Sequence, residues 1–574
     1  MSGPAPLRFC PSRDGTAPTR YRRAMAHPIQ LLDDVSEADR FARVRAVELN
    51  QSIYRWQHLS GLPAFCDGLP EPERESAFDA VRTAYDITTS IASAAVTTVA
   101  WTLNNTRRNK LRHYDRFTLA RNRPAVASRW RDDEEFARQR LNGVNPLLIE
   151  RCERVPRHLA VTDERVRPII GDRSLSSLGD AGRLFLCDWH ELQGVPVNLG
   201  RFLTAPMALF WIDDRGVLMP LAIQLGQEPQ RERPGDDPVV FTPADDRWLW
   251  LAARTHVQTA DAAYHEVLAH LFRTHLVMET VKVALCRSLP PKHPIHELLE
   301  PSFEGTININ YKARNDLIAP GGPIDEAISV GTEGAYWLIN QANSKYSFTD
   351  LDPRTHFEAR GVLDDLPGYH YRDDALDLWD AIGKFADKVL RIYYKNDAAV
   401  AGDDELADFA HELSAPDAGG IKGLPLVGDR FSTIPDLLHF VQQVIFTSAC
   451  EHSAVNNGQW DYFGYIPNAP GSVFLPPPAS LAPWSEAEFC YMLPPMRLVD
   501  TQMTLVHLLS APPSTRLGDY PDTFFLSFDP VHKIMDQFRD DLDVIAKKIA
   551  DRNRHLPVPY TYLDPVQIAC SVSV

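Results

Sequence analysis

The chain lacks the marks of a secreted or membrane-spanning protein. Its eight cysteines are scattered over 574 residues, and no two form a Cys-X-X-Cys pair. We therefore expect mostly buried free thiols in a reducing compartment. The N-terminus has no apolar signal core, and the longest apolar run, 91–103, is shorter than the roughly 20 residues that span a bilayer. These absences predict a soluble protein of the cytoplasm.

The chain also has fewer basic than acidic residues. The chain has 59 Lys and Arg against 76 Asp and Glu, a formal net charge of −17. Binding to nucleic-acid phosphates needs a basic face, so we expect no nucleic-acid partner. Broad electrostatic docking on anionic membranes is disfavoured for the same reason. The hydrophobic content of 44% is ordinary for a globular protein and allows a large core.

The organisation along the chain predicts one large, mainly α domain. Residues 1–25 resemble a disordered tail, and no linker or internal repeat divides 26–574. Within this domain, 26–140 is predicted to be a helical N-terminal or lid region, including a long helix at 78–103, and 141–574 a metal-binding core. A small β subregion is predicted at 183–187, 207–211 and 220–225, with a hairpin turn at 213–216. The remaining periodic segments predict helices at 248–287, 374–394, 435–457 and 530–554.

Three histidines five residues apart stand out within the first of these helices. They are His265, His270 and His275, in an apolar stretch that also holds Glu266 and Glu279. Imidazole is the commonest protein ligand for transition metals. Five residues advance about 140° beyond a full turn of an α-helix, so neighbouring members would diverge. A π-helical turn brings i and i+5 together and favours functional sites. The spacing predicts either three unrelated histidines or a metal site on a π-helix.

A second polar pair lies in the helix predicted at 435–457. His452 and Asn456 are four residues apart and share one helical face. They fit either the second half of a metal site or a capped helix end, since Asn456, Asn457 and Gly458 can close a helix.

The C-terminus, ending at Val574, is apolar. An apolar end favours burial, and a buried α-carboxylate is costly unless it is paired or bound to a metal.

Taken together, these motifs resemble the lipoxygenase family. The segment 265–279 is similar to the family's first metal-binding signature, and 452–459 to its second. Further runs that resemble the family extend to the C-terminus and are closest to animal-type enzymes. They are 141–146, 220–225, 287–294, 371–374 and 462–468. The resemblance covers the catalytic domain only and leaves no room for an N-terminal β-sandwich membrane-targeting domain, so we expect no calcium-regulated membrane module.

The resemblance implies a ligand set for one non-heme iron ion. His270, His275 and His452 become ligands, Asn456 a weak or variable fourth, and the main-chain carboxylate of Val574 completes the set. The family usually ends in Ile; a terminal Val resembles manganese-using members, so manganese is the alternative metal. His265 and Glu266 then lie beside the ligands, and Gln459 links the metal surroundings to the substrate helix through hydrogen bonds.

The resemblance also implies the reaction and the pocket. An M(III)–OH centre takes a hydrogen atom from a cis,cis-1,4-pentadiene of a polyunsaturated fatty acid, and O2 adds to give a lipid hydroperoxide. Ala313 occupies the stereocontrol position, where Ala tends to give S products and Gly R products. Leu271, Leu317, Ile324 and Leu509 are expected to form the apolar wall around the reacting carbon, and Ala262, Ala327 and Ile328 to set pocket depth. The implied partners are the fatty acid and O2, with transient membrane or phospholipid contact, in a monomer.

Three other functions compete with this dioxygenase. A zincin-like hydrolase needs histidines at i and i+4, which the His265–His270 spacing does not provide. A hydroperoxide isomerase or epoxyalcohol synthase could use the same metal site, although Ala313 argues mildly against it. A catalytically inert lipid-binding homologue is the third, and the complete set of implied ligands argues against it.

Overall fold

The structure is a computed structural model that describes residues 29–74, 110–120, 122–227, 238–510, 515–521, 524–525 and 528–572. The predicted tail at 1–25, the predicted helix at 78–103 and the terminal Val574 lie outside the described residues.

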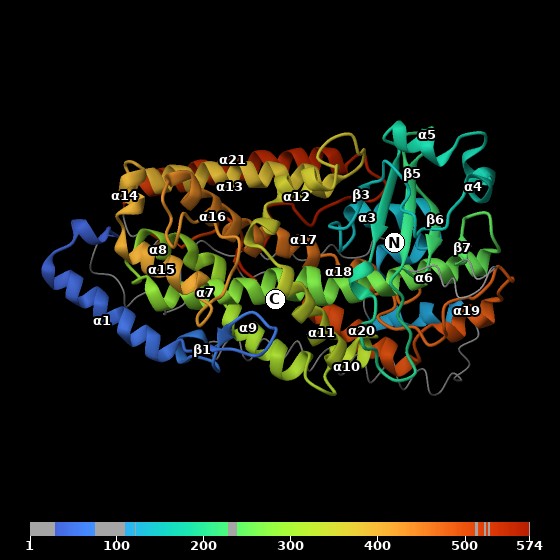
Figure 1. Cartoon of the computed structure of the whole chain (residues 1–574), viewed down its shortest axis with the longest axis horizontal. Helices are drawn as coiled ribbons and strands as arrows, with labels where there is room; N and C mark the ends of the chain where they lie inside the picture. Colours follow the sequence, from blue (N-terminus) through green and yellow to red (C-terminus); the bar gives the residue numbers. More distant parts are fainter. Residues whose placement is uncertain are drawn as a thin grey trace, which may run out of the picture.

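A long continuous helix runs through the middle of the molecule (Figure 1). It consists of α6 (Arg247–Tyr264), the π-helix η7 (His265–Leu276) and α7 (Val277–Ser288). The Asp246 side chain caps its start by accepting from the backbone N–H groups of Trp248 and Leu249. Nearly every residue of the helix is buried, as expected for a helix that other elements surround.

A layer of long helices covers one side of this central helix (Figure 1). It contains α13 (His370–Tyr393), α21 (Asp529–Asn553) and a second continuous helix made of α16 (Ile434–Phe446), the π-helix η11 (Thr447–Glu451) and α17 (His452–Asn456). α13 packs against both α16 and α21; the rings of Phe385 and Phe538 stack between α13 and α21, with centroids 4.6 Å apart. η11 and α17 contact η7, which joins the two helices that carry the predicted metal ligands.

The remaining helical elements are shorter. The α-helices are α1 (Glu37–Ile53), α3 (Asp133–Asn142), α4 (Asp163–Ile170), α5 (Leu175–Asp180), α8 (Pro294–Leu299), α9 (Thr306–Lys312), α10 (Pro323–Ala327), α11 (Gly331–Lys345), α12 (Pro353–Ala359), α14 (Asp397–Ala401), α15 (Asp404–Ser414), α18 (Gln459–Phe463), α19 (Glu486–Met492) and α20 (Met496–Leu509). A third π-helix is η9 (Ala313–Leu317), and 3-10 turns occupy Leu32–Asp34, Glu71–Glu73, Leu111–Ala120, Ala125–Ser128, His190–Leu192, Glu300–Phe303 and Phe348–Leu351.

The predicted β subregion is a five-stranded antiparallel sheet at one end of the molecule (Figure 1). Its strands follow sequence order: β3 (Glu150–Arg151), β4 (Leu184–Asp188), β5 (Met207–Ile212), β6 (Leu218–Gln224) and β7 (Val240–Phe241). The β5–β6 turn is closed by the Asp213 N–H donating to the Val217 carbonyl, with Gly216 at φ 76°. The predicted sheet and turn are both confirmed.

Part of the N-terminal region, which was predicted to be helical, forms two short strands. α1 is followed by a small hairpin of β1 (Trp56–Gln57) and β2 (Phe65–Cys66), paired as Trp56 with Cys66 and Gln57 with Phe65. Strands of two residues are too short to show an alternating pattern, which is why the sequence did not reveal them. Long-range contacts with the core, described below, hold this hairpin.

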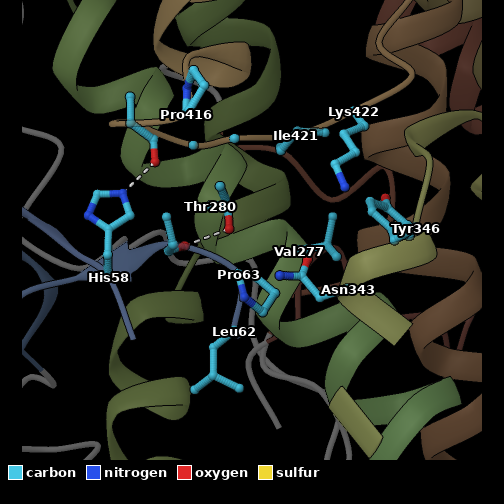
Figure 2. Close-up of a pocket in the computed structure, with 14 residues that line it drawn as sticks. His58, Leu62, Pro63, Val277, Thr280, Asn343, Tyr346, Pro416, Ile421 and Lys422 are labelled. Carbon is cyan, nitrogen blue, oxygen red and sulfur yellow. Dashed lines mark hydrogen bonds between the residues drawn. The ribbon is translucent and has the colours of Figure 1, made fainter. Parts of the chain in front are cut away.

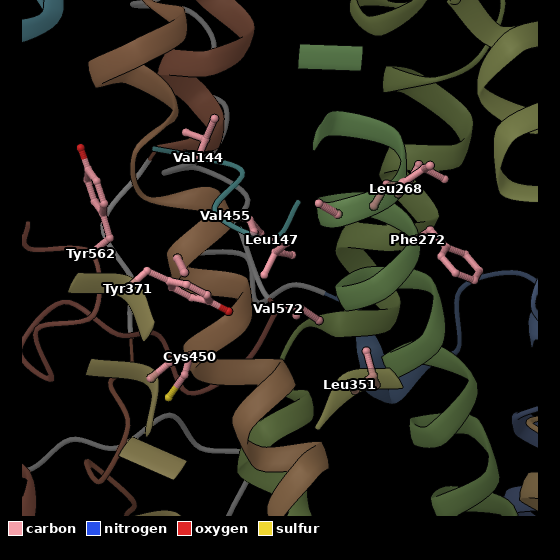
Figure 3. Close-up of a cluster of buried hydrophobic side chains, with 14 of the residues drawn as sticks. Val144, Leu147, Leu268, Phe272, Leu351, Tyr371, Cys450, Val455, Tyr562 and Val572 are labelled. Atoms are coloured by element: carbon pink, nitrogen blue, oxygen red, sulfur yellow. The ribbon is translucent and has the colours of Figure 1, made fainter. Parts of the chain in front are cut away.

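One hydrophobic core extends through the helical body. Figure 3 shows part of it, where Leu268 and Phe272 of η7, Val455 of α17 and the C-terminal Val572 lie in one buried cluster. Seven cysteines in the described part of the chain are free and buried, as expected from the sequence. Within the same part, no helix combines the length and apolar character that crossing a bilayer requires.

Candidate metal centre

Three of the histidines singled out in the sequence converge at one buried point. The Nε2 atoms of His270 and His275 are 3.2 Å apart, those of His275 and His452 3.2 Å, and those of His270 and His452 3.4 Å. Nitrogens that bind one ion at about 2.1 Å lie about 3.0 to 3.4 Å apart for octahedral to tetrahedral angles. The triangle therefore has the dimensions of three adjacent ligands on one ion.

The π-helix explains how residues five apart reach the same point. η7 spans His265–Leu276, so the backbone widens over the whole stretch in which the sequence predicts a π-helical turn. In a regular α-helix, the rings of His270 and His275 would diverge by about 140°. Their centroids are 4.8 Å apart here, and the prediction is confirmed.

The third histidine is held against this pair by a buried ion pair. Arg273 of η7 donates from Nε to the Oε1 atom of Glu451, which precedes His452, at 2.8 Å. The Glu451 side chain is 2% exposed. Glu451 ends the π-helix η11, which the sequence did not predict. Two π-helices are thus fastened together directly beside the converging nitrogens.

Asn310 of α9 is a residue whose role the sequence analysis missed. Its Nδ2 donates to the His275 carbonyl at 2.8 Å and to Glu279 Oε2 at 2.9 Å. Because both partners are acceptors, the amide orientation is fixed, and its Oδ1 must accept from His275 Nδ1, 2.9 Å away. His275 is thereby held in the tautomer that leaves the Nε2 lone pair available to a metal.

Burial keeps these imidazoles neutral. The desolvation of the ring lowers the pKa of His270 to about 4, and desolvation followed by repulsion from His270 lowers the pKa of His275 to about 3. Neutral imidazole is the form that binds metals.

His265 lies beside the triangle without joining it. Its ring centroid is 5.7 Å from that of His270, and its Nε2 bonds to the Val455 carbonyl at 2.7 Å. Desolvation lowers its pKa to about 4, and desolvation raises the pKa of the neighbouring Glu266. Neither His265 nor Glu266 joins the group of three converging histidines in the described part of the chain.

Asn456 and Gln459 lie beyond His452 in the same buried region. Both are fully buried, and Gln459 Nε2 donates to Asn456 Oδ1 at 2.9 Å. Asn456 Nδ2 and Gln459 Oε1 find no hydrogen-bond partner among the described residues. A carbonyl oxygen has two lone pairs, so Asn456 Oδ1 can serve a metal while it accepts from Gln459. Three imidazoles and an amide, with no thiolate, fit a redox-capable ion such as iron or manganese better than a structural zinc.

Comparison with known proteins shows the family of this chain. The family model described as Lipoxygenase matches residues 69–559. The chain belongs to the lipoxygenase family. It is 36% identical over 549 residues to the mouse polyunsaturated fatty acid lipoxygenase ALOX8, covering 93% of this chain and 80% of that protein. It is also 36% identical over 458 residues to the human hydroperoxide isomerase ALOXE3, covering 78% of this chain and 63% of that protein.

Solved lipoxygenase structures share the fold. One is a calcium-dependent 11R-lipoxygenase, with a TM-score of 0.88 and 30% identity over 96% of this chain and 82% of the other. Another is an engineered lipoxygenase in complex with arachidonate, with a TM-score of 0.89 and 27% identity over 96% of this chain and 84% of the other. The predicted lipoxygenase-type helical fold is confirmed.

The predicted pocket residues of this lipoxygenase all belong to the main hydrophobic core or pack against it. Six are buried in the main core and two are partly buried against it; the former are Ala262, Leu271, Ala313, Ile324, Ala327 and Ile328, and the latter Leu317 and Leu509. Ala313 begins the π-helix η9, whose neighbour α10 packs against α20. These residues come from α6, η7, η9, α10, the turn after α10, and α20.

A separate cavity of about 140 Å³ lies beside α7 (Figure 2). Its walls come from 58–64, Val277 and Thr280 of α7, Asn343 and Tyr346, and the loop 416–422. Thr280 Oγ1 donates to the Ala64 carbonyl at 2.6 Å, which fastens the N-terminal segment over α7. None of the predicted pocket residues of this lipoxygenase lines this cavity.

The groups of a second cluster of potential metal ligands are bound to partners within the protein. His293 Nε2 lies 3.1 Å from Asp403 Oδ2, which also accepts from the Tyr394 hydroxyl at 2.8 Å. Glu405 pairs with the guanidinium of Arg43. Each group has a protein partner, so this cluster is an ion-pair network that attaches α1 to α15.

The lowered histidine pKa values predict a pH-dependent stability of the metal-free protein. Unfolding returns each imidazole to a pKa of about 6.5, so the unfolded chain binds more protons below that pH. Stability is expected to fall as the pH drops from 6.5 towards 4, by up to about 1.4 kcal/mol per pH unit for each of His265, His270 and His275. Urea unfolding at pH 7.5, 6.0 and 5.0 measures this, and His265→Asn is expected to reduce the slope. An unfolding free energy that stays constant over this range contradicts the prediction.

Proposed function

We propose that this lipoxygenase inserts O2 into polyunsaturated fatty acids that contain a cis,cis-1,4-pentadiene and releases S hydroperoxides. The observation that carries the proposal is the convergence of three imidazole Nε2 atoms, 3.2 to 3.4 Å apart. Those of His270 and His275 come from the π-helix η7, and that of His452 comes from α17. The overall conversion adds one O2 to one fatty acid, so no other reductant or oxidant is consumed.

The proposed cofactor is one non-heme iron ion, with manganese as the alternative. His270, His275 and His452 would hold it, together with the Asn456 amide and the Val574 carboxylate. Support for Val574 comes from the chain just before it: the Ala569 N–H donates to Ser453 Oγ at 3.2 Å, and Val572 is fully buried. The C-terminal segment therefore runs beside the residue that follows His452.

When bound, a redox-active ion supplies the one-electron oxidation that removes a hydrogen atom from the doubly allylic carbon. The chain contributes positioning. Asn310 holds the His275 ring in one tautomer, while Gln459 orients Asn456. The proposed wall of Leu271, Leu317, Ile324 and Leu509 would clamp the reacting carbon and exclude water, and the small Ala262 and Ala327 beside Ile328 would leave depth for the hydrocarbon tail.

The proposal includes a monomeric protein of the cytoplasm that contacts membrane or phospholipid transiently. The exposed side of α1 supports such contact, because Phe41, Val44 and Leu49 are 55% to 70% exposed there, beside exposed arginines. Apolar side chains flanked by basic ones are typical of helices that lie in a membrane interface.

An oxygen-electrode assay separates this proposal from its two alternatives. Oxygen uptake with linoleate, matched by hydroperoxide formation, is the expected result. Anaerobic consumption of linoleate hydroperoxide without oxygen uptake would instead identify a hydroperoxide isomerase, the activity for which the relative ALOXE3 is named. Binding without any conversion would identify a catalytically inert lipid-binding homologue. Metal analysis of the purified protein distinguishes iron from manganese.

Ala313→Gly is expected to move the product from S towards R. Removing the methyl group of this buried residue would open a second position on the substrate radical to O2. We expect the S:R ratio to change by about tenfold, equivalent to about 1.4 kcal/mol between the two transition states. Chiral chromatography of the reduced product measures the ratio. Ala327→Gly serves as a control and should leave the ratio unchanged; an unchanged ratio in Ala313→Gly removes that residue from the mechanism.

A further inference from the structure

The N-terminal hairpin contacts both members of a buried ion pair behind the metal centre. Arg314 donates to Glu279 from Nη1 at 2.5 Å and from Nη2 at 2.9 Å. The guanidinium of Arg314 lies 4.2 Å from the ring centroid of Phe65, and the N–H of Cys66 donates to Glu279 Oε1 at 3.2 Å. Two consecutive residues of β2 thus complete the surroundings of this pair.

Glu279 connects the hairpin to a proposed metal ligand through Asn310. Its Oε2 accepts from Asn310 Nδ2 at 2.9 Å, and Asn310 Oδ1 accepts from His275 Nδ1 at 2.9 Å. Glu279 and Asn310 are both fully buried, and every oxygen of the Glu279 carboxylate has at least two donors. A shift of the carboxylate would therefore turn the Asn310 amide and with it the His275 ring.

Arg314 is also adjacent in the chain to the proposed stereocontrol residue. It follows Ala313 directly in the π-helix η9. A π-helix is a strained insertion that neighbouring contacts must maintain. The bidentate pair with Glu279 and the Phe65 ring both hold the guanidinium of Arg314, and so restrain the backbone at Ala313.

The aromatic ring matters for an electrostatic reason. The Arg314 side chain is 11% exposed and Glu279 is fully buried, so the guanidinium has little water to solvate it. The face of an aromatic ring carries negative charge density and stabilises a desolvated cation, whereas a leucine of similar size does not.

We propose that Phe65 is a positioning residue for the metal centre, acting through Arg314 and Glu279 on His275 and on Ala313. The inference rests on the proposed function, because it assigns His275 to the metal and Ala313 to the control of oxygen addition. It makes the N-terminal hairpin part of the reaction machinery rather than an appendage of the fold.

The test compares three variants of the full-length metal-loaded protein. Phe65→Leu removes the ring face, Phe65→Tyr keeps it, and Tyr54→Phe is a control in the same segment. Tyr54 donates to Glu73 at 2.7 Å and has no bond to the Arg314–Glu279 pair, so its change weakens the docking of the segment alone. The readouts are the rate of metal loss to a chelator, the S:R ratio of the product, and the thermal unfolding midpoint.

We expect Phe65→Leu to lose metal about three- to tenfold faster than the wild type. Loss of a hydrogen-bond partner of a metal ligand lowers metal affinity about 10- to 100-fold, and Phe65 lies three contacts beyond such a partner, Asn310, so its effect should be smaller. Its S:R ratio should also shift. Phe65→Tyr should restore both, and Tyr54→Phe should change only the unfolding midpoint. Wild-type metal retention and S:R ratio in Phe65→Leu overturn the inference, as does an equal change in Tyr54→Phe. If Phe65→Leu does not fold, Phe65→Met provides the same comparison.

The same experiment keeps the two proposals apart. A wild-type protein that holds metal but takes up no oxygen with linoleate contradicts the proposed function. The metal-loss rates of the variants would still decide whether Phe65 acts on His275.

Discussion

Replacing His452 with alanine is expected to abolish metal binding and oxygen uptake. His452 supplies one of three converging nitrogens, and no other histidine, cysteine, aspartate or glutamate in the described part of the chain joins that group. Loss of a direct ligand should exceed the roughly 100-fold effect that residues behind the ligands have on metal affinity. Metal content after gel filtration and oxygen uptake with linoleate measure the two effects.

His265→Ala is the matched control for this experiment. His265 is as fully buried as His452 and stacks beside His270, but its Nε2 is engaged by the Val455 carbonyl. We expect this variant to retain metal, with affinity reduced by about tenfold at most. Equal loss of metal from His265→Ala and His452→Ala would show that the three-ligand assignment is wrong.

Replacing Arg273 with methionine is expected to lower the free energy of unfolding of the metal-free protein by about 3–5 kcal/mol. The change leaves the carboxylate of Glu451, 2% exposed, without its charged partner inside the core. The cost arises mainly from burying an uncompensated charge, because a carboxylate pays a large desolvation penalty. Urea unfolding monitored by circular dichroism measures the difference.

A surface pair provides the control for Arg273. Arg391 pairs with Asp387 at 2.9 Å with 58% of the arginine side chain exposed, and Arg391→Met should cost no more than about 1 kcal/mol. The double variant Arg273→Met with Glu451→Gln should recover part of the loss, because it removes the stranded charge. A cost for Arg273→Met as small as that for Arg391→Met would contradict the role of the buried pair.

Structural features that produce a regular pattern of residues could be predicted from the sequence. The i, i+5 spacing of His270 and His275 predicted the π-helix η7, because only that geometry brings both rings to one point. The hairpin turn at Asp213–Gly216 and the long helices were likewise visible as turn residues and apolar periodicity. The π-helices η9 and η11 were not predicted, since neither contains two marked residues five apart.

Contacts between distant segments could not be predicted from one sequence. Asn310 is 35 residues from His275, and an asparagine in an apolar stretch carries no signal of which ring it will meet. The link from Phe65 to Arg314 joins segments about 250 residues apart in the chain, and the two-residue strand that provides it is too short to show periodicity. Only folding of the N-terminal segment onto α7 and η9 creates that link.

The burial of the cysteines has a consequence for the durability of the enzyme. A protein that releases hydroperoxides is exposed to its own oxidant, and peroxides attack the thiolate rather than the thiol. Desolvation raises the pKa of Cys66, Cys286 and Cys490 to about 12, so almost no thiolate exists at these positions at neutral pH. Among the cysteines that the structure describes, each thiol is shielded in this way. Loss of activity during turnover is therefore expected to begin at the metal centre or at methionines, with the thiols still titratable after unfolding.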